Sequence, residues 1–446
     1  MDRTSPVSSG KSVLLISTVF PPEYSPGAIR PSKMAKYLPE FGWTPIVLTS
    51  APNAALAEDG GQAPPCLILR APRRHPAELY VRLRSAMRRR NSSRVDQSVP
   101  IATTQGARRR IADYVLFPDD RICWIPGAIR LGVQAIRRHK PSILYSTSPD
   151  PSAHLVALAL ARLMHLPWVA EFRDPWTMNS FRKARPFAWM ERAEHKLERR
   201  VVTNADHIVV TSAEYAEDFI RNYPGLDVGI FSHLPNGFDP EDFECVEAER
   251  FDKFTIVHAG NFYEQRSARP FLLGLRRWLE CDKQALASTQ VLFVGRKDPD
   301  STVAIRELGL QGTVIQTGVL GHRQTVANML GADILLLVPG PGVGTMPGKV
   351  FEYLAARKPI LTIADEGVAR ELVRRTGTGS TVHPSDIAGL AAELARIREA
   401  IVARSFPYPD TTQLLRQYNR RCIAGLLASV LDEMMERRTK TPLAVP

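Results

Sequence analysis

The segment VPGPGVGTMPGKVFEYLAARKPIL (residues 338–361) holds the densest group of residues that could bind a phosphate. Glycine-rich backbone that leads into a helix start presents free N–H groups to an anion. Gly348 lies directly before that start, Lys349 would add positive charge, and Glu352 could accept hydrogen bonds from a ribose diol. The alternative is a flexible loop followed by an ordinary surface helix. A kinase-type phosphate loop is excluded because Val350, and not Ser or Thr, follows Lys349.

Two further segments offer phosphate contacts. After the sequence HAGN, which ends at Asn261, Arg266 would lie beyond a strand end. A guanidinium there could hold a diphosphate with two hydrogen bonds. In the segment VFPPEYSPGAIR, Gly27 precedes a helix start that could receive a phosphate, although a plain strand-to-helix turn explains it equally well.

The first half of the chain also contains candidates for contacts to a sugar or an acceptor. His154, at the end of TSPDPSAH, could form a hydrogen bond to a sugar hydroxyl, although a structural histidine fits the same position. Arg173 and Asp174, in EFRDPW, suit a polyol or a phosphate, although a local salt bridge fits them equally. Arg30 is a further candidate for contact with the acceptor or the sugar.

The residues that could bind a metal are few. Asp119 and Asp120 resemble the acidic pair of metal-dependent transferases, but a dipeptide is weak evidence. The five cysteines are scattered, no two of them have metal-ligand spacing, and an odd number argues against a disulfide framework. The sequence therefore predicts no metal site.

Short apolar strands that alternate with helices would position these residues. In the first half we expect strands at 13–18, 43–49, 66–69, 143–146, 168–172 and 207–211, and helices at 31–41, 127–139, 154–164 and 185–202. After an acidic linker at 234–250, we expect strands at 255–259, 291–295, 314–317, 334–338 and 360–362, and a final helix at 411–437. This alternation predicts βαβ units, parallel sheets and ligand-binding loops at the carboxyl ends of the strands.

Two strand sets of near-equal size predict two doubly wound, Rossmann-like α/β domains. The predicted organisation is a first domain at 1–235, a second at 251–405, a helical segment at 406–437 and a disordered tail at 438–446. The first domain would carry a basic, irregular insert at about 70–118.

The charge and hydropathy of the chain limit its location and partners. The net charge is +12 over 446 residues. Five arginines crowd the insert, and such a cluster binds anionic lipid or forms a solvated face: Arg82, Arg84, Arg88, Arg89 and Arg90. Because no run of about 18 apolar residues and no signal-peptide core occur, we expect a cytoplasmic protein. Lipid binding by the insert would make it peripheral on the inner face of the plasma membrane.

Together, these segments resemble glycosyltransferase family 4, the retaining enzymes of GT-B fold. The resemblance is strongest to the branch that builds bacterial surface polysaccharides, including exopolysaccharide and lipopolysaccharide, and it covers about residues 11–430. It is carried by FPPEYSPGAIRPSKMAKYL, PWVAEFRDPW, ADHIVVTSAEYAEDF, LPNGFDPEDF, HAGNFY, VLFVGR and PGKVFEYLAARKPIL. The order and spacing of these motifs make the match, and no single motif decides it.

The resemblance implies two domains that face each other across a cleft, with a C-terminal helix that crosses back. It implies a hexosyltransferase-type enzyme that moves a sugar from a nucleoside diphosphate sugar to an acceptor hydroxyl with retention. The second domain would bind the donor, and the first would bind a glycan or a lipid-linked saccharide as acceptor. The family's chemistry implies no cofactor beyond the donor and no metal requirement, because cations and helix dipoles hold the leaving diphosphate.

The family's motifs assign roles by position, and this chain departs from them in places. Glu352 corresponds to the family's ribose-binding glutamate, whereas Gly344 stands where many members have a second glutamate. Asn261 stands near the position of a family arginine, and Arg266 near that of a family lysine. The charge is only partly retained there, and Lys349 would have to compensate for it.

Two other readings of the sequence stay open. A sugar-nucleotide epimerase would share the fold and the ribose-binding glutamate. A non-enzymatic protein that binds a membrane or a nucleic acid would explain the basic insert. We expect no nucleic-acid partner, because the sequence lacks a helix-turn-helix, zinc or RNA-binding signature.

Overall fold

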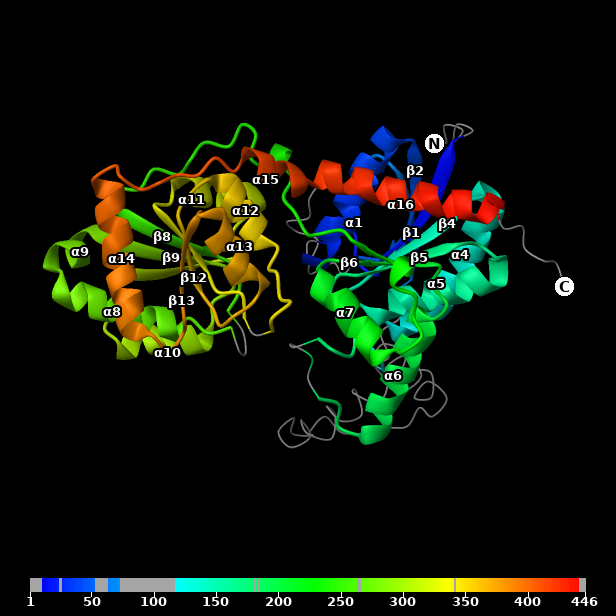
Figure 1. Cartoon of the computed structure of the whole chain (residues 1–446), viewed down its shortest axis with the longest axis horizontal. Helices are drawn as coiled ribbons and strands as arrows, with labels where there is room; N and C mark the ends of the chain where they lie inside the picture. The colour runs from blue at the N-terminus through cyan, green and yellow to red at the C-terminus, as the bar shows by residue number, and fades with distance from the viewer. Residues whose placement is uncertain are drawn as a thin grey trace, which may run out of the picture. The chain divides into compact units, whose positions relative to one another are not determined.

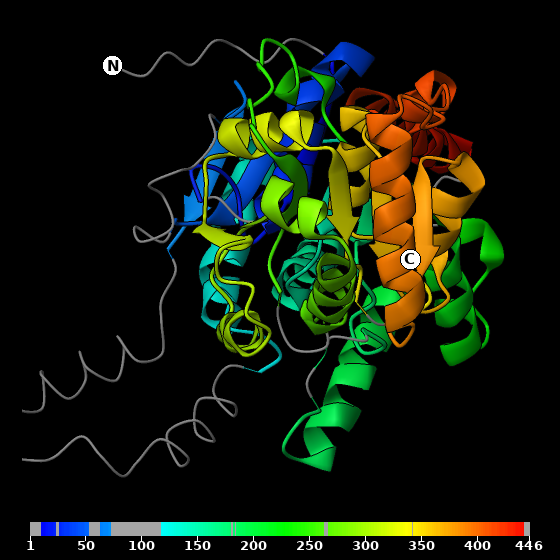
Figure 2. The same ribbon diagram turned by 90° about the vertical axis from the view of Figure 1, so that its left-hand side faces the viewer.

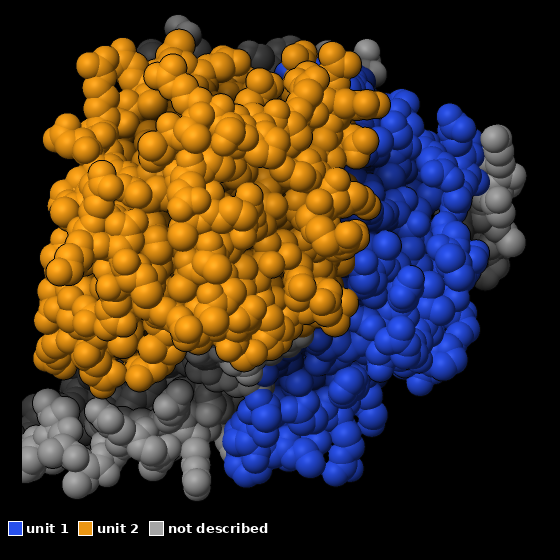
Figure 3. Space-filling view, turned by 60° about the vertical axis from the view of Figure 1, so that its left-hand side comes forward, with its two compact units in different colours: residues 1–234, 424–446 blue, residues 235–423 orange. Residues whose placement is uncertain are grey.

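The structure of the chain, a computed structural model, describes residues 10–23, 26–52, 63–72, 117–179, 182, 184–262, 266–340 and 342–440. The chain divides into two compact units, which Figure 3 colours separately. The first unit comprises residues 1–234 and 424–446, and the second comprises residues 235–423. The five clustered arginines and nearly all of the predicted insert lie outside the described residues.

The first unit is built on a seven-stranded, fully parallel sheet with the order β3-β2-β1-β4-β5-β6-β7 (Figure 1). Its strands are β1 (Lys11–Ile16), β2 (Trp43–Ser50), β3 (Leu67–Ala71), β4 (Ile143–Thr147), β5 (Trp168–Phe172), β6 (His207–Val210) and β7 (Phe231–His233). The predicted strands are confirmed to within two residues at each end, whereas the short edge strand β7 was not predicted.

Helices cover both faces of this sheet, as the continuously buried strands require. They are α1 (Pro26–Tyr37), α4 (Ile125–His139), α5 (Pro151–Met164), α6 (Ala188–Val202) and α7 (Ala213–Asn222). One core contains Leu14 and Ile16 of β1, and the alternating residues Val13 and Leu15 are fully buried as well. The fold class predicted for this half of the chain is confirmed.

The first helix begins earlier than the prediction places it. It starts at Pro26 and not at residue 31, so that Pro31 lies inside α1. The predicted end is confirmed, because Gly42 closes the turn after η1 (Leu38–Phe41) in the left-handed region, with φ 80°.

The second unit contains a six-stranded, fully parallel sheet with the order β10-β9-β8-β11-β12-β13. Its strands are β8 (Phe254–Ala259), β9 (Thr289–Val294), β10 (Val314–Gly318), β11 (Ile334–Leu337), β12 (Ile360–Ile363) and β13 (Gly379–Val382). Both sheets therefore have the same doubly wound order, with a point at which the direction of strand addition reverses.

Two helix layers enclose this second sheet (Figure 2). One core joins the sheet to α8 (Arg269–Cys281), α10 (Pro299–Glu307) and α14 (Ile387–Val402), and the opposite core joins it to α11 (His322–Gly331), α12 (Lys349–Ala356) and α13 (Val368–Thr376). The short helix α9 (Lys283–Ser288) leads into β9. Parallel strands covered on both faces predict that ligand contacts come from the loops at the strand ends.

The chain returns to the first unit through its last helix. The single helix predicted at 411–437 is two helices, α15 (Thr412–Gln417) and α16 (Arg420–Lys440). The break occurs because Phe238 N–H donates to the carbonyl of Tyr418 (3.0 Å), which pins the predicted linker to the helix junction. Asp432 of α16 then accepts hydrogen bonds from Lys11 and Trp43 of the first unit.

The predicted tail therefore begins too early, since residues 438–440 continue α16, and residues 441–446 lie outside the described part. The crossing of the C-terminal helix to the first unit is confirmed.

Candidate active site

The sheet of the second unit opens at its switch point, between β8 and β11. The two strands pair only at Ile334 with Ile256 and at Leu335 with Val257. Beyond these pairs, the Tyr353 hydroxyl accepts a hydrogen bond from Ala259 N–H (2.8 Å) and donates to the carbonyl of Leu336 (3.2 Å). A side chain thus replaces the missing ladder bonds, and the strand ends separate where an open α/β sheet binds its ligands.

His258, the last but one residue of β8, contributes to the same opening. Its Nδ1 bonds the carbonyl of Leu336 (2.9 Å), and its ring stacks on Phe262 with centroids 4.2 Å apart. Burial, together with the nearby charges of Arg266 and Lys349, lowers the pKa of His258 to about 4, although its hydrogen bond to Leu336 acts in the opposite direction. The imidazole is therefore neutral at pH 7, with its proton on Nδ1 and the lone pair on Nε2.

Arg266 bridges the two loops of this opening. It follows β8, and its Nη2 donates to the carbonyl of Pro339, which follows β11. Its charge acts on both His258 and Tyr353. The structure thus places the predicted diphosphate-binding arginine at the switch point itself.

Lys349 and Glu352 lie in the first turn of α12, directly after the β11 loop. Lys349 Nζ donates to Glu352 Oε2 at 2.5 Å, and both side chains are partly buried. An ammonium group has three donors, so this pair leaves two donors of Lys349 for a further acceptor. The charges of Lys349 and Arg266 both act on His258, so the two predicted cations lie near the same buried histidine.

The glycine-rich loop before α12 is hydrogen-bonded to the loop that follows β12. Val368 N–H donates to the carbonyl of Val343 (2.9 Å), and Gly367 approaches the same carbonyl so closely that an added Cβ would lie 3.0 Å from it. A small pocket separates the two loops, lined by residues of 339–345 and 364–370, among them Asp365, Glu366 and Arg370. These contacts give the glycine-rich loop a fixed shape beside Lys349.

Asn261 and Gly348 are two further residues that the sequence predicts to bind the nucleotide sugar. Asn261 Oδ1 accepts a hydrogen bond from Arg296 N–H (2.8 Å), so this side chain joins the loops after β8 and β9. Gly348 caps α12 with ordinary helical angles, and a Cβ built there would meet nothing within 4 Å. Gly348 is thus not required by the fold, and open space lies beside it.

The first unit has an acidic cluster at its own switch point, between β1 and β4. The Thr18 hydroxyl donates to Asp150, and the Arg121 guanidinium lies 3.2 Å from Glu23 and 3.7 Å from Asp150. Asp119 accepts hydrogen bonds from Ser152 N–H and Oγ (both 2.7 Å), at the start of α5. Burial and the charge of Asp150 raise the pKa of Asp119 to about 6.

Sequence reasoning recognised only the Asp119–Asp120 dipeptide of this cluster. The structure gives Asp119 the role of a helix cap, and Asp120 lies 3.5 Å from Arg121. The signal that predicts the cluster is the presence of carboxylates after both switch-point strands, in the loops at Glu23 and Asp150.

Arg30 is fully buried in the core of the first unit. Its Nε and Nη2 both donate to Glu171 Oε1 (2.9 and 2.8 Å), and Nη2 also donates to the carbonyl of Leu234 (2.9 Å). Thr147 donates to the second oxygen of Glu171 (2.6 Å). This ion pair lowers the pKa of Glu171 despite burial. Arg30 therefore links α1, β5 and the end of the first unit, and the geometry supports a structural role for it.

Arg173 supports the start of α1. Pro31 has no N–H for the carbonyl of Gly27, four residues earlier, and Arg173 Nη1 donates to that carbonyl instead (3.0 Å). Its Nη2 donates to the carbonyl of Pro26 (3.1 Å). The predicted residues Gly27 and Arg173 thus lie together, in contacts that explain how a helix can start ahead of Pro31.

His154 lies in the core behind the switch point. Its side chain is 1% exposed, Nδ1 bonds the Ser146 hydroxyl (2.8 Å), and the ring lies 4.5 Å from the ring of Phe172. Burial lowers the pKa of His154 to about 3. These contacts fit the structural alternative better than contact with a sugar hydroxyl.

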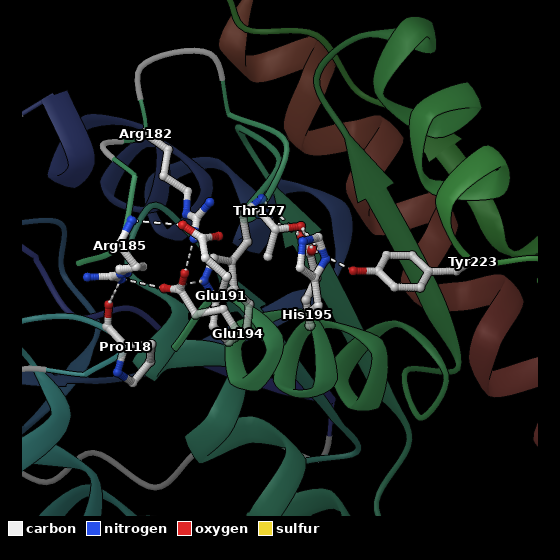
Figure 4. A network of polar contacts seen from close by, with 10 residues as sticks. Pro118, Thr177, Arg182, Arg185, Glu191, Glu194, His195 and Tyr223 are labelled. Atoms are coloured by element: carbon white, nitrogen blue, oxygen red, sulfur yellow. Dashed lines mark hydrogen bonds and ion pairs between the residues drawn. The ribbon is translucent and has the colours of Figure 1, made fainter. Parts of the chain in front are cut away.

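Asp174 is exposed beyond the end of β5. The segment that follows it makes polar contacts with α6 (Figure 4). Three glutamates on one face of α6 bind this segment: Glu191, Glu194 and Glu198. Glu194 binds Arg182 and Arg185, and Glu198 accepts hydrogen bonds from the backbone of Trp176 and Thr177 and from the Tyr223 hydroxyl. The spacing of these glutamates along the predicted helix is the signal that sequence reasoning missed.

Comparisons with solved structures give the class of the fold. The chain resembles the sucrose-phosphate synthase of Thermosynechococcus elongatus, with 15% identity, coverage of 96% of this chain and 100% of that one, and a TM-score of 0.67. It resembles Anabaena Alr3699/HepE in complex with UDP, with 13% identity, coverage of 95% and 100%, and a TM-score of 0.62. It also resembles the lipopolysaccharide outer core galactosyltransferase WaaB, with 13% identity, coverage of 95% and 99%, and a TM-score of 0.54. The two doubly wound units are therefore a GT-B fold.

Family models make the assignment more specific. The model described as Glycosyltransferase Family 4 matches residues 32–242, and the model described as Glycosyl transferases group 1 matches residues 253–399. The chain is a glycosyltransferase of the family 4 type. A search among curated proteins finds no match. In the described part of the chain, no helix has the length and apolar character needed to cross a bilayer.

Proposed function

We propose that the enzyme transfers a sugar from a nucleoside diphosphate sugar to a hydroxyl of a polysaccharide or lipid-linked saccharide precursor, with retention. The observation that carries the proposal is the convergence of Arg266, Lys349 and Glu352 at the switch point of the second sheet. Two cations beside a helix start suit a diphosphate, and a carboxylate one turn further suits a ribose diol. The UDP complex of the Anabaena relative makes UDP-sugars the first donors to test.

The proposed reaction assigns a task to each group. The acceptor oxygen forms a bond to the anomeric carbon as the bond from that carbon to the diphosphate oxygen breaks. The electron pair leaves with the diphosphate, which also takes the proton of the acceptor hydroxyl. Arg266 and the two remaining donors of Lys349 would stabilise the charge that develops on the leaving group. In this scheme side chains supply the positive charge, and no metal is required.

The acceptor and the location belong to the same proposal. The lipopolysaccharide galactosyltransferase among the relatives supports a bacterial surface glycan, exopolysaccharide or lipopolysaccharide, as the product. We place the enzyme in the cytoplasm, with the arginines at 82–90 as the segment that would contact anionic lipid. Asp174, exposed at a strand end, is the first-unit residue that we would test for contact with the acceptor.

A thermal-shift screen against UDP-, GDP-, ADP- and dTDP-sugars tests the donor, because a ligand that binds the native state raises its melting temperature. Lys349→Ala should weaken binding of the active nucleotide sugar by about tenfold or more. Lys283→Ala, on the exposed part of α9, is the matched control and should change nothing. Unchanged affinity of the Lys349 variant would remove this lysine from the site. Product analysis separates a transferase from an epimerase, which would release nucleotide and sugar without an acceptor.

A further inference from the structure

A second, larger pocket of the second unit lies at the edge of the sheet away from the candidate active site. Its volume is about 280 Å³, and it is lined by the end of α12, by Thr378 before β13, and by residues 406–411 after α14. The active-site residues follow β8 and β11, whereas Lys358 and Thr378 precede β12 and β13. Strands of four residues separate the two edges by about 13 Å. The pocket is therefore distinct from the donor site.

Two adjacent cations, Arg357 and Lys358, line this pocket together with one carboxylate, Asp410. In the part of the chain that the structure describes, no ion pair within 4 Å involves Arg357 or Lys358, and Arg357 reaches only the Thr412 hydroxyl, at 3.5 Å. The charges of Arg357 and Lys358 act on Asp410 and Asp333 from beyond ion-pair distance, so both cations keep donors for a bound anion.

An aromatic side chain lies beside these cations. Tyr408 is 58% exposed, and its ring lies 5.1 Å from that of Phe406, which is buried in the core and anchors the segment. Thr411 also lines the pocket, and its buried hydroxyl has no hydrogen-bond partner among the described residues. An exposed aromatic face, a spare hydroxyl and two cations suit a ring that carries an anionic group.

We infer that this pocket binds a small organic anion, a ring with a phosphate or carboxylate group, at a site separate from the donor. Arg357 and Lys358 bind the anionic group, and the ring lies on Tyr408. At about 280 Å³, the pocket lies at the lower end of the size range of small-molecule sites, which suits a monosaccharide phosphate better than the larger nucleotide sugar. Since α12 joins the pocket, at its end, to Lys349 and Glu352, at its start, the bound anion is positioned to influence donor binding.

Glucose 6-phosphate is the first probe, with gluconate as the carboxylate arm and glucose as the uncharged control. At concentrations up to about 10 mM, one of the anions should raise the melting temperature of the full chain, and glucose should not. In the same samples, hydrogen exchange should slow in peptides that cover 354–358 and 403–411. If neither anion raises the melting temperature, or if the slowed peptides lie only at 258–266 and 339–352, the inference is overturned.

Variants assign the effect to the two cations. Arg357 has a φ of 53°, a left-handed conformation that asparagine tolerates, so Arg357→Asn combined with Lys358→Gln removes both charges with little strain. This double variant should bind the active anion at least about tenfold more weakly. The control is Arg374→Gln with Arg396→Gln, which removes two charges at paired surface sites and should keep full affinity. Equal loss in both variants would overturn the inference.

Binding of the nucleotide sugar is measured in the same variants. The proposed transferase function requires that Arg357→Asn with Lys358→Gln still binds the donor in the absence of the anion, because neither residue lies in the donor site. Loss of the anion effect with donor binding retained supports the second site. Failure of every nucleotide sugar to bind the wild type would contradict the proposed function and leave the anion test unaffected.

Discussion

The two switch points of the molecule share one topology and differ in charge. Each sheet reverses its strand order next to its central strand, β1 in the first unit and β8 in the second. The second-unit opening carries two cations, Arg266 and Lys349, with Glu352 as the adjacent carboxylate. In the first-unit opening, four carboxylates lie near Arg121, namely Glu23, Asp119, Asp120 and Asp150, and Arg70 also acts on Glu23.

This difference shows that topology locates a site and that side chains decide what it binds. The first unit also has cations near its switch point, but it uses them for its own structure: Arg30 binds a buried glutamate, and Arg173 binds the carbonyls at the start of α1. In the second unit Arg266 donates to the Pro339 carbonyl and lies beside a glycine-rich loop. An anionic donor therefore suits the second opening, and a ligand rich in hydroxyl groups suits the first.

The largest effect should come from the buried arginine of the first unit. Arg30→Met leaves Glu171 charged and unpaired in the core, and breaking a buried pair in this way costs about 3–5 kcal/mol. Urea unfolding should show this loss, and Arg30→Met with Glu171→Gln should recover part of it. If Arg30→Met is as stable as the wild type and instead loses only acceptor affinity, Arg30 belongs to the acceptor site and the comparison fails.

The arginine of the second unit should behave in the opposite way. Arg266→Gln should leave the melting temperature nearly unchanged and lower kcat/KM by about 10²–10³-fold, because in the proposed reaction it removes a charge that stabilises the leaving group. Arg269→Gln, three residues later and paired with the exposed Glu307, is the control and should keep full activity. An Arg266 variant that unfolds like Arg30→Met would show that both arginines are structural.

The alternation of strands and helices could be predicted from the sequence, because it follows from local hydropathy and length. The long-range partners of the charged residues could not. Arg30 and Glu171 are 141 positions apart, and nothing in the spacing around either residue indicates the other. The same limit applies to the start of α1: Pro31 is expected to begin a helix, and only the distant Arg173 explains why it lies inside one.

The residues that lie at the second opening are easier to recognise in the sequence. Lys349 and Glu352 are neighbours on one helix, and Arg266 follows a recognisable strand, so local patterns identify them. His258 and Tyr353 were missed, because a histidine inside a strand and a tyrosine inside a helix look like core residues. Their polar atoms matter only because β8 and β11 separate at this point, which is a property of the sheet and not of either segment.

The acidity of the first opening makes a prediction about pH. The folded-state pKa of Asp119, about 6, exceeds the ordinary value of 3.8, so the folded state binds more protons between these values and stability falls as pH rises through the window. From pH 4.5 to 7.5, the wild type should lose about 2 kcal/mol relative to Asp119→Asn, which keeps an oxygen for the α5 cap and cannot ionise. Urea unfolding at both pH values measures the difference. If Asp119→Asn shows no pH-dependent gain, the carboxylates of the first opening are ordinary and the charge contrast between the two openings is weaker than the structure indicates.

The smallest effect should come from Gly348, where the fold itself tolerates a side chain. Its backbone angles are helical, and a Cβ would meet nothing within 4 Å, so Gly348→Ala should change stability by less than about 0.5 kcal/mol. If a diphosphate lies against this helix start, the added methyl group occupies part of its space, and KM for the donor should rise severalfold with kcat nearly unchanged. Gly312→Ala also adds a methyl group in open space, but it lies just before β10, at the amino ends of the strands and away from the donor site. It should leave KM for the donor unchanged. A Gly348 variant with unchanged KM would mean that Lys349 and Arg266 hold the diphosphate without help from the backbone at the helix start.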